Sequence, residues 1–332
     1  MRAINDHLKT ENNSKFTYFS RAILGIGKIT YMKKKILVTG SNGFIGQEIL
    51  HQALAASDIE LVALSRGENR FHKREGYTYL SADVCDEEEI ARLIDEFRPD
   101  AVIHTVAMAN VDECEKDPAS CRLVNVESVK YLKKAAEKYN FHLIYLSTDF
   151  IFDGLNGPYS EQDEPNPLNE YGKSKLEAED LLRNSNCKWS IVRTILVYGA
   201  PHEASRSNLV LWVKKSLEAG TEIKVVTDHF RMPTLVSDVA KACLEIAHRE
   251  AEGVFHISSD ELFSIYEIAL QVADFWNLDR SLITPVLSGS FPSSVSRPSY
   301  TGFVIDKAKV ELDFRPHTLK EGLLEISKLL PT

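Results

Sequence analysis

The sequence predicts an α/β fold built on a doubly wound parallel sheet. Residues 36–38 (ILV) form an apolar run without polar interruption, which is typical of a strand buried on both faces. Glycines follow at Gly40, Gly43 and Gly46, and apolar residues then recur at helical spacing. Further apolar runs alternate with helical stretches along the chain. This alternation predicts parallel strands joined by helices that cover both faces of the sheet.

The segment 33–46 (KKKILVTGSNGFIG) has the strand, glycine turn and helix that a dinucleotide-binding fingerprint requires. Gly40 permits the tight turn, Gly43 lets the backbone approach a pyrophosphate, and Gly46 lets the helix pack closely on the strand. The spacing is GxxGxxG rather than GxGxxG, and the alternative is an ordinary strand-to-helix turn. The order of elements favours a Rossmann-type nucleotide site at the positive end of the helix. We expect it to be lined by Gly40, Asn42, Gly43, Phe44, Ile45 and Gly46.

The second predicted strand, 59–64 (IELVAL), ends at the position that usually selects the cofactor. An acidic side chain there would hydrogen-bond the adenosine ribose of NAD. This chain has Ser65 and Arg66 instead, and a hydroxyl with a guanidinium suits a 2′-phosphate. We therefore expect NADP(H) as the preferred cofactor, with NAD(H) as the alternative. The competing interpretation of Arg66 is a solvated loop charge.

The third and fourth predicted strands, 77–80 and 101–105, also end in residues that could contact a cofactor. Asp83 is placed to accept the adenine amino group and Val84 to cover the ring, and the alternative for Asp83 is a turn aspartate. Small residues after the fourth strand allow close approach of a cofactor, namely Val106 and Ala107.

The fifth predicted strand, 141–146, leads into the stretch where chemistry is expected. It closes on Ser147, Thr148 and Asp149, so these side chains face the crevice at the carboxyl ends of the strands. Tyr171 and Lys175 begin the next helix and lie on one face of it. A lysine ammonium beside a phenol lowers the phenol pKa, so that the tyrosine can protonate a carbonyl oxygen while a hydride arrives at the carbon. A second YxxxK, at 31–35, lacks this context.

Three segments are expected along the chain. Residues 1–31 form an N-terminal extension, either disordered or a mis-assigned start, with Met32 as the expected initiator. Residues 32–195 form the NAD(P)-binding domain, which includes the YxxxK helix. Residues 196–332, broken by Pro and Gly, form mainly a substrate-binding lobe interleaved with that domain. Polar residues expected to contact an anionic substrate are Asp149, Asn208, Arg231 and Arg297, although a surface position is the alternative for the last three.

Composition narrows the classes of protein to consider. The 332 residues are 44% hydrophobic and 26% charged, which is ordinary for a globular enzyme. A formal net charge of -9 argues against nucleic acid or an anionic membrane as the partner. Five cysteines without a CxxC pair favour free thiols in a reducing compartment, so we expect a cytoplasmic protein without a metal site. No apolar run approaches membrane-spanning length.

Several strings together resemble the extended short-chain dehydrogenase/reductases, and more narrowly the dTDP-4-dehydrorhamnose reductase family. They are VTGSNGFIG, LSTDFIFDG, PYSEQDEPNPLNEYGKSK, RTILVYG, DHFRMPT and SRPSY. The resemblance implies reduction of the C4 ketone of a deoxyhexose nucleotide by a nicotinamide cofactor, as in dTDP-rhamnose and polysaccharide biosynthesis. It also implies a catalytic triad in which Thr148 orients the ketone, Tyr171 gives the proton, and Lys175 holds the nicotinamide ribose and tunes Tyr171.

One departure and two alternatives accompany this resemblance. The family often has Trp where this chain has Leu196, which removes a stacking surface for the sugar. The regulatory subunit of methionine adenosyltransferase is similar to the same family, and that resemblance implies an NADP-binding regulatory module. A nucleotide-sugar epimerase is the other alternative. The resemblance is also compatible with a homodimer.

Overall fold

The computed structural model describes residues 33–200, 208–291 and 295–330. Its centre is a seven-stranded parallel sheet in the order β11-β6-β5-β4-β1-β2-β3. The order reverses between β1 and β4, which confirms the predicted doubly wound sheet and places a ligand crevice at that point. The strands are β1 (Lys34–Thr39), β2 (Ile59–Ser65), β3 (Thr78–Ser81), β4 (Ala101–His104), β5 (His142–Thr148), β6 (Trp189–Thr194) and β11 (Gly253–Ile257).

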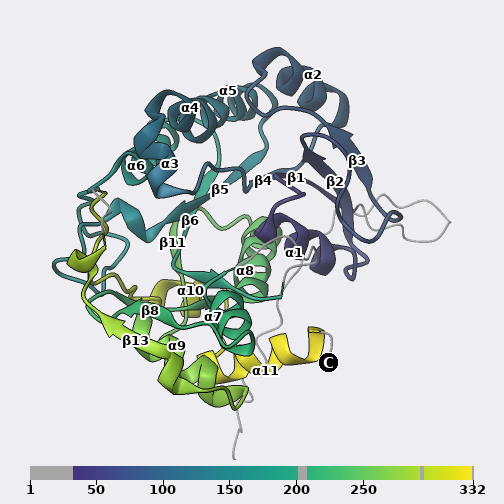
Figure 1. The fold of residues 1–332 in the computed structure, drawn as a ribbon. Coiled ribbons are helices and arrows are strands. Elements are labelled where there is room, and N and C mark those ends of the chain that lie inside the picture. Colours follow the sequence, from purple (N-terminus) through teal and green to yellow (C-terminus); the bar gives the residue numbers. More distant parts are fainter. Residues whose placement is uncertain (1–32, 201–207, 292–294, 331–332) are drawn as a thin grey trace, which may run out of the picture.

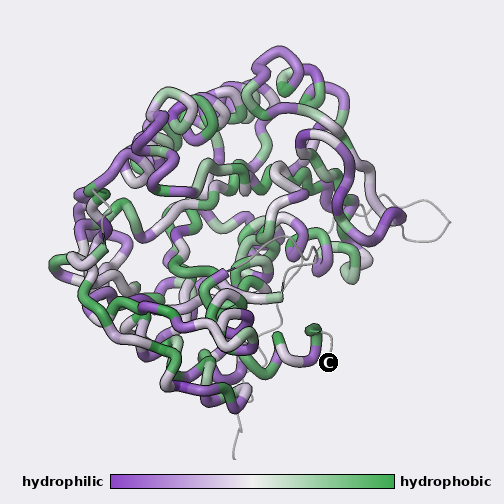
Figure 2. Tube along the Cα trace, viewed as in Figure 1, coloured by the Kyte–Doolittle hydropathy of each residue, from purple (hydrophilic) through white to green (hydrophobic). Residues whose placement is uncertain are grey.

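Helices cover both faces of this sheet (Figure 1). One face carries α2 (Glu87–Phe97), α5 (Ser128–Tyr139) and α6 (Glu170–Arg183), and the other carries α1 (Phe44–Ala53) and α8 (Val236–Arg249). Successive side chains of a strand point to opposite faces, so Leu37 packs with the first group while Ile36 and Val38 pack with the second. Hydrophobic residues accordingly concentrate on the central strands in Figure 2.

Local signals explain where these helices begin. The Asp86 side chain caps α2 by accepting from the Glu89 N–H, and three glutamates occupy the first turn, where the helix dipole favours negative charge. Asn169 caps α6 by accepting from the Gly172 N–H, which fixes the start of the YxxxK helix. The first turn of α6 therefore has a defined position relative to the end of β5.

The C-terminal half builds a smaller lobe with its own hydrophobic cluster. Its helices are α7 (Leu209–Glu218), α9 (Ile265–Phe275) and α11 (Leu319–Leu329), and its strand pairs are β8 (Ile223–Val226) with β13 (Ile283–Val286), β9 (Phe230–Arg231) with β12 (Phe263–Ser264), and β7 (Val197–Tyr198) with β10 (Thr234–Leu235). The same half also supplies β11 and α8 to the large sheet, with α10 (Asp306–Glu311) packed beside β11. The two predicted segments thus share one sheet.

The remaining short elements follow β4 and β5 or belong to the lobe. Two short helices and a π-helical turn connect β4 to α5, and a 3-10 turn follows β5: α3 (Val111–Lys116), α4 (Pro118–Arg122), η1 (Leu123–Glu127) and η2 (Asp149–Ile151). Two further 3-10 turns lie in the lobe, η3 (Arg280–Leu282) and η4 (Ser288–Ser290).

The expected N-terminal extension, 1–31, and the expected start at Met32 lie outside the described residues.

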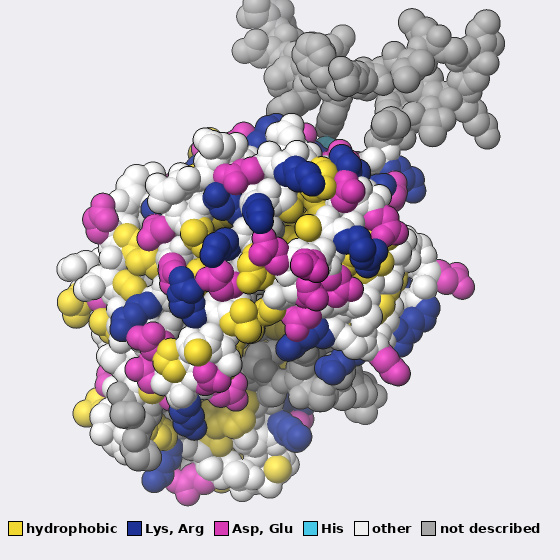
Figure 3. Space-filling model, turned by 90° about the horizontal axis from the view of Figure 1, so that it is seen from above, with side chains coloured by type: hydrophobic (Ala, Val, Ile, Leu, Met, Phe, Trp, Pro, Cys, Tyr) yellow, Lys and Arg dark blue, Asp and Glu magenta, His cyan; other side chains and the backbone are white. Residues whose placement is uncertain are grey.

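The described surface is polar and mixed in charge. Basic and acidic side chains are interspersed over the face seen in Figure 3. Several of them pair, as Lys134 on α5 does with Glu87 on α2 at 2.6 Å. Within the described ranges, no helix is both long enough and apolar enough to cross a membrane, and no group of His, Cys, Asp or Glu side chains is arranged to hold a metal ion.

Candidate active site

One pocket of about 610 Å³ lies at the carboxyl ends of the central strands. It extends from the glycine turn after β1 to the end of β5 and the first turns of α6. The sequence-predicted residues that line it are Gly40, Asn42, Gly43, Phe44, Ile45, Ser65, Arg66, Asp83, Val84, Val106, Ala107, Thr148, Asp149, Tyr171 and Lys175. Gly46, Asn208, Arg231 and Arg297 do not line it.

The glycine turn has the geometry expected of a pyrophosphate cradle. Gly40 has φ +75°, and a Cβ there would lie 2.6 Å from Thr105 Oγ1, so only glycine fits. A Cβ on Gly46 would collide with the Gly40 carbonyl oxygen, which agrees with its predicted packing role. Gly43 precedes helix α1 and provides no side-chain cap, so the N–H groups in the first turn of the helix are available to a phosphate. A dinucleotide therefore fits this end of the pocket.

Asn42 organises the loop beside this cradle. Its amide nitrogen donates to the Glu68 carbonyl at 2.9 Å and lies 3.1 Å from the Tyr79 hydroxyl, while its amide oxygen accepts from the Arg70 N–H at 2.8 Å. The side chain is 5% exposed. Asn42 thereby fixes the loop after β2, which carries Arg66, beside the glycine turn.

Arg66 lies at the rim of the pocket. Its guanidinium lies 3.6 Å from the Asp83 carboxylate, and its side chain is 76% exposed. Ser65 ends β2 next to it, and Val84 is buried. A cation and a hydroxyl therefore stand where β2 ends, as the sequence predicts for a site that accepts a 2′-phosphate.

The three predicted catalytic side chains meet at the other end of the pocket. Thr148 ends β5, and Tyr171 and Lys175 occupy successive turns of α6. The Tyr171 ring packs edge-on against Phe150 with centroids 5.7 Å apart. Lys175 is 2% exposed, and its ammonium donates to the Leu146 carbonyl at 2.6 Å.

Burial dominates the protonation of these groups. It raises the pKa of Tyr171, and the hydrogen bond with Thr148 opposes that rise. It also lowers the pKa of Lys175 to about 7, against the opposing charge of Glu179. The sequence predicts a lowered phenol pKa, and the structure gives the opposite direction, because the burial of Tyr171 outweighs its hydrogen bond with Thr148. A protonated phenol is the form that donates a proton.

A buried ion pair lies behind the triad. Arg193 on β6 and Glu179 on α6 are fully buried and joined by two hydrogen bonds, 3.0 Å from Nε to Oε1 and 2.7 Å from Nη2 to Oε2. Ser147 donates to Glu179 Oε1 at 2.6 Å, one residue before Thr148. The sequence carries a signal for this pair, because Arg193 ends an apolar strand and Glu179 follows Lys175 by one helical turn.

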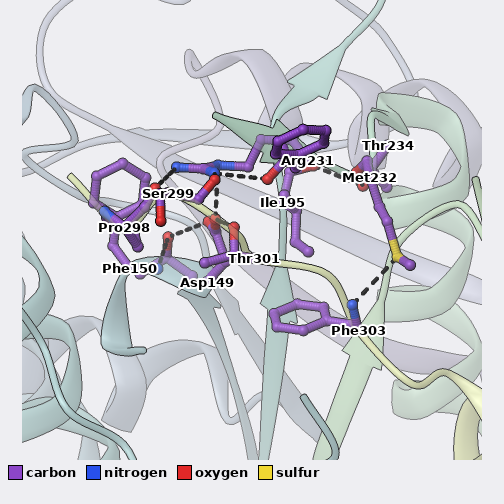
Figure 4. Close-up of polar contacts among 12 residues, drawn as sticks. Asp149, Phe150, Ile195, Arg231, Met232, Thr234, Pro298, Ser299, Thr301 and Phe303 are labelled. Carbon is purple, nitrogen blue, oxygen red and sulfur yellow. Dashed lines mark hydrogen bonds and ion pairs between the residues drawn. The ribbon is translucent and has the colours of Figure 1, made fainter. Parts of the chain in front are cut away.

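Arg231 contacts a different set of groups from the predicted one (Figure 4). Its side chain is buried, with Nε 3.3 Å from Asp149 Oδ2. Nη2 donates to the Pro298 carbonyl at 2.6 Å and Nη1 to the Phe230 carbonyl at 2.7 Å. Protein oxygens surround its guanidinium outside the pocket lining, and its assignment to an anionic substrate stays a prediction.

Asn208 and Arg297 also lie outside the pocket lining. Asn208 caps α7 by accepting from the Leu211 N–H at 3.2 Å, and its amide donates to the Gly199 carbonyl at 2.8 Å. Arg297 pairs with Asp112 at 2.5 Å. Their assignment to substrate stays a prediction.

Other lining residues were not predicted from the sequence. They include Arg70, Thr105, Val111, Phe150, Thr194 and Val197. Phe150, Thr194 and Val197 lie in strings that carry the family resemblance but were given no role there. Leu196 also lines the pocket and has φ +40°, which is unusual for a bulky residue. An apolar run followed by a Gly or Pro turn is the signal that could have pointed to 194–197, but such runs also occur in the core.

The chain is similar to known proteins over most of its length. The model of the RmlD substrate binding domain family matches residues 33–330. The chain is 31% identical to methionine adenosyltransferase 2 subunit beta from Danio rerio, covering 80% of this chain and 81% of that protein. It is 28% identical to the spore coat polysaccharide biosynthesis protein SpsK from Bacillus subtilis, covering 88% and 96%.

Solved structures give the same family. A dTDP-4-dehydrorhamnose reductase from Clostridium acetobutylicum superposes with a TM-score of 0.79 at 29% identity, covering 89% of this chain and 99% of that chain. A dTDP-4-dehydrorhamnose reductase from Bacillus anthracis, solved with NADP, has a TM-score of 0.80 at 24% identity, covering 90% and 100%. The resemblance predicted from the sequence is confirmed. With a family model that spans nearly the whole described chain, this protein belongs to the RmlD substrate-binding-domain family of extended short-chain dehydrogenases/reductases.

Proposed function

We propose that this chain is an NAD(P)-dependent oxidoreductase that uses NADPH to reduce the C4 ketone of a deoxyhexose nucleotide. The observation that carries the proposal is the meeting of Thr148, Tyr171 and Lys175 in a pocket whose other end is a glycine turn suited to a dinucleotide. The dTDP-4-dehydrorhamnose reductases among the similar structures support the choice of reaction.

Each part of the pocket has a function toward the cofactor in this proposal, and the bound nicotinamide supplies a hydride. The N–H groups in the first turn of α1 bind the pyrophosphate. Ser65 and Arg66 bind the 2′-phosphate, with Asp83 and Val84 beside the adenine. Lys175 holds the nicotinamide ribose, and Val106 and Ala107 let the ring approach.

Tyr171 acts as the general acid. Burial keeps its phenol protonated, so a proton is available at the oxygen of the reacting carbonyl. Thr148 lies within hydrogen-bonding reach of that phenol and holds the ketone oxygen beside it. Tyr171 thus neutralises the negative charge that develops on the oxygen as the carbon is reduced.

Arg66 is expected to set the preference for the phosphorylated cofactor. Arg66→Ala should weaken NADPH binding about tenfold or more, because a charge-assisted hydrogen bond to the 2′-phosphate is lost. NADH affinity should change little, since NADH lacks that phosphate. Titration of both cofactors checks this, with Arg74→Ala as the matched control, since Arg74 contacts the Asn69 carbonyl outside the pocket lining. Equal losses for the two cofactors would contradict the assignment.

A regulatory function is the second candidate. Methionine adenosyltransferase 2 subunit beta is among the relatives above 30% identity, and a pocket for NADP with the same triad would serve a regulatory module as well. In that function the protein would bind NADPH without turning it over. An epimerase would also fit the fold, and it would retain its cofactor through purification.

The experiment that separates these functions follows NADPH absorbance with a dTDP-4-keto-6-deoxyhexose generated in situ by its upstream enzymes. NADH is tested alongside. Rapid NADPH oxidation that depends on the sugar nucleotide supports the reductase. Tight NADPH binding without oxidation supports the regulatory function, and a cofactor carried through purification supports the epimerase.

A further inference from the structure

The carboxylate next to the catalytic threonine is buried and held from three sides (Figure 4). Asp149 is 3% exposed. Its Oδ1 accepts a hydrogen bond from the Thr148 hydroxyl at 3.2 Å. Its Oδ2 accepts from the Thr301 hydroxyl at 2.5 Å and lies 3.3 Å from Nε of Arg231. These partners fix the carboxylate in position and oppose the rise in its pKa that burial causes.

Arg231 holds this carboxylate from outside the pocket. Its remaining N–H groups donate to the carbonyls of Phe230, Pro298 and Ser299. The Phe230 N–H donates to the Ser299 carbonyl at 2.7 Å, which attaches the same segment to β9. The guanidinium therefore connects the segment 298–301 to the end of β5, and its influence on the pocket passes through Asp149.

The hydrogen bonds of Thr148 set the direction of its hydroxyl. A threonine hydroxyl has one proton and two lone pairs. Thr148 donates its proton to Asp149 at 3.2 Å and accepts from the Phe150 N–H at 3.2 Å, and these two contacts fix the direction of its hydroxyl. The Tyr171 phenol lies within hydrogen-bonding reach of this hydroxyl, so its orientation depends on Asp149 through Thr148. A protonated Asp149 would be a weaker hydrogen-bond acceptor, so the Thr148 hydroxyl would no longer be held toward it. The orientation of the Tyr171 phenol would then be lost.

We propose that Arg231 is a positioning residue that acts through Asp149 and Thr148 to orient the proton-donating phenol of Tyr171. The inference rests on the proposed reductase function, in which Tyr171 is the general acid. Thr301 contributes to the same positioning, because its hydroxyl donates to Oδ2 of the Asp149 carboxylate.

Among the described residues, the charged and titratable groups that face Asp149 are Arg231 from β9 and Tyr171 from α6. Burial raises the pKa of Asp149, and the Arg231 charge is the largest opposing influence. His229 lies beside Arg231, and burial followed by that charge lowers its pKa, which keeps it neutral. Removal of the Arg231 charge would raise the pKa of Asp149 further, so Asp149 would take up a proton at higher pH.

Four variants test the proposal. Arg231→Met should lower kcat about ten- to a hundredfold, because a small misorientation of a catalytic group is enough for such a loss. Its acid limb of kcat should move to higher pH, while KM and NADPH affinity change little. Arg231→Lys should recover part of kcat. Thr301→Val should also lower kcat, but by a smaller factor than Arg231→Met.

Thr234→Val is the matched control for Thr301→Val. Both threonines are fully buried, and the Thr234 hydroxyl donates to the Ile195 carbonyl at 2.7 Å without contacting Asp149. Its loss should cost stability and leave kcat near that of the wild type. Comparison of kcat between Thr301→Val and Thr234→Val therefore tests the proposal even if Arg231→Met is too unstable to purify.

The outcomes separate this inference from the reductase proposal. An active wild type in which Arg231→Met or Thr301→Val leaves kcat and the pH profile unchanged would overturn the inference, and so would a rise in KM alone. If the wild type reduces no sugar nucleotide, the reductase proposal fails. The inference is then tested by carboxyl NMR of protein labelled with ¹³C-aspartate. The Asp149 signal is assigned by its absence in Asp149→Asn. The Asp149 signal should titrate at a pH about one unit higher or more in Arg231→Met. An unchanged titration would overturn it.

Discussion

Tyr171→Phe should lower turnover by about a hundredfold or more, while NADPH affinity stays near that of the wild type. The substitution removes the phenolic proton and keeps the ring, so the edge-on packing against Phe150 is retained. Because Tyr171 acts only on the oxygen of the reacting carbonyl, the loss should fall on kcat. Steady-state kinetics with the keto sugar nucleotide, together with an NADPH titration, measure the two quantities separately.

Tyr198→Phe is the control for this experiment. Tyr198 is 1% exposed, and its hydroxyl has no hydrogen-bond partner among the described residues. It lies outside the pocket lining, so the loss of its hydroxyl should leave kcat unchanged. Turnover by Tyr171→Phe at the level of Tyr198→Phe would remove Tyr171 from the mechanism.

Arg193→Met should lower the free energy of unfolding by about 3–5 kcal/mol, the largest stability effect that we expect from a single substitution. Arg193 is fully buried and makes two hydrogen bonds to the Glu179 carboxylate. Methionine fills much of the volume but leaves that carboxylate without its buried cation. Urea unfolding followed by circular dichroism gives the free energy directly.

Arg183→Met is the matched control, because Arg183 pairs with the same Glu179 oxygen at 2.9 Å. The Arg183 side chain is 33% exposed, so water compensates for much of the lost charge, and the cost should stay below about 1 kcal/mol. Similar costs for the two substitutions would show that burial does not decide the contribution of each arginine.

The parts of the site that lie close together in the chain were predictable from the sequence. The glycine turn is a local feature, since Gly40 has φ +75° and a Cβ on Gly46 would collide with the Gly40 carbonyl oxygen. The placement of Tyr171 and Lys175 on one face follows from helical periodicity alone. The doubly wound parallel sheet follows from alternating strands and helices and the preference for right-handed crossovers.

The contacts that depend on distant segments were not predictable. Arg231 looks like a surface charge in the sequence. Two of its three carbonyl partners lie on 298–299, which only the folded lobe brings near β9. The Tyr171 pKa depends on burial by residues from several elements, so the lysine four residues away did not decide its direction. The spacing of residues in a helix predicts which side chains lie close together. Their pKa values and hydrogen bonds depend on the groups that surround them in the folded protein.

The most direct test of the reductase proposal follows the hydride itself. NADPH deuterated at the transferable C4 position is incubated with the protein and a dTDP-4-keto-6-deoxyhexose, and the product is analysed by mass spectrometry and NMR. We predict one deuterium bonded to C4 of the sugar, formed in proportion to NADPH consumed. Bound NADPH that keeps its deuterium, with the keto sugar unchanged, would contradict the proposal.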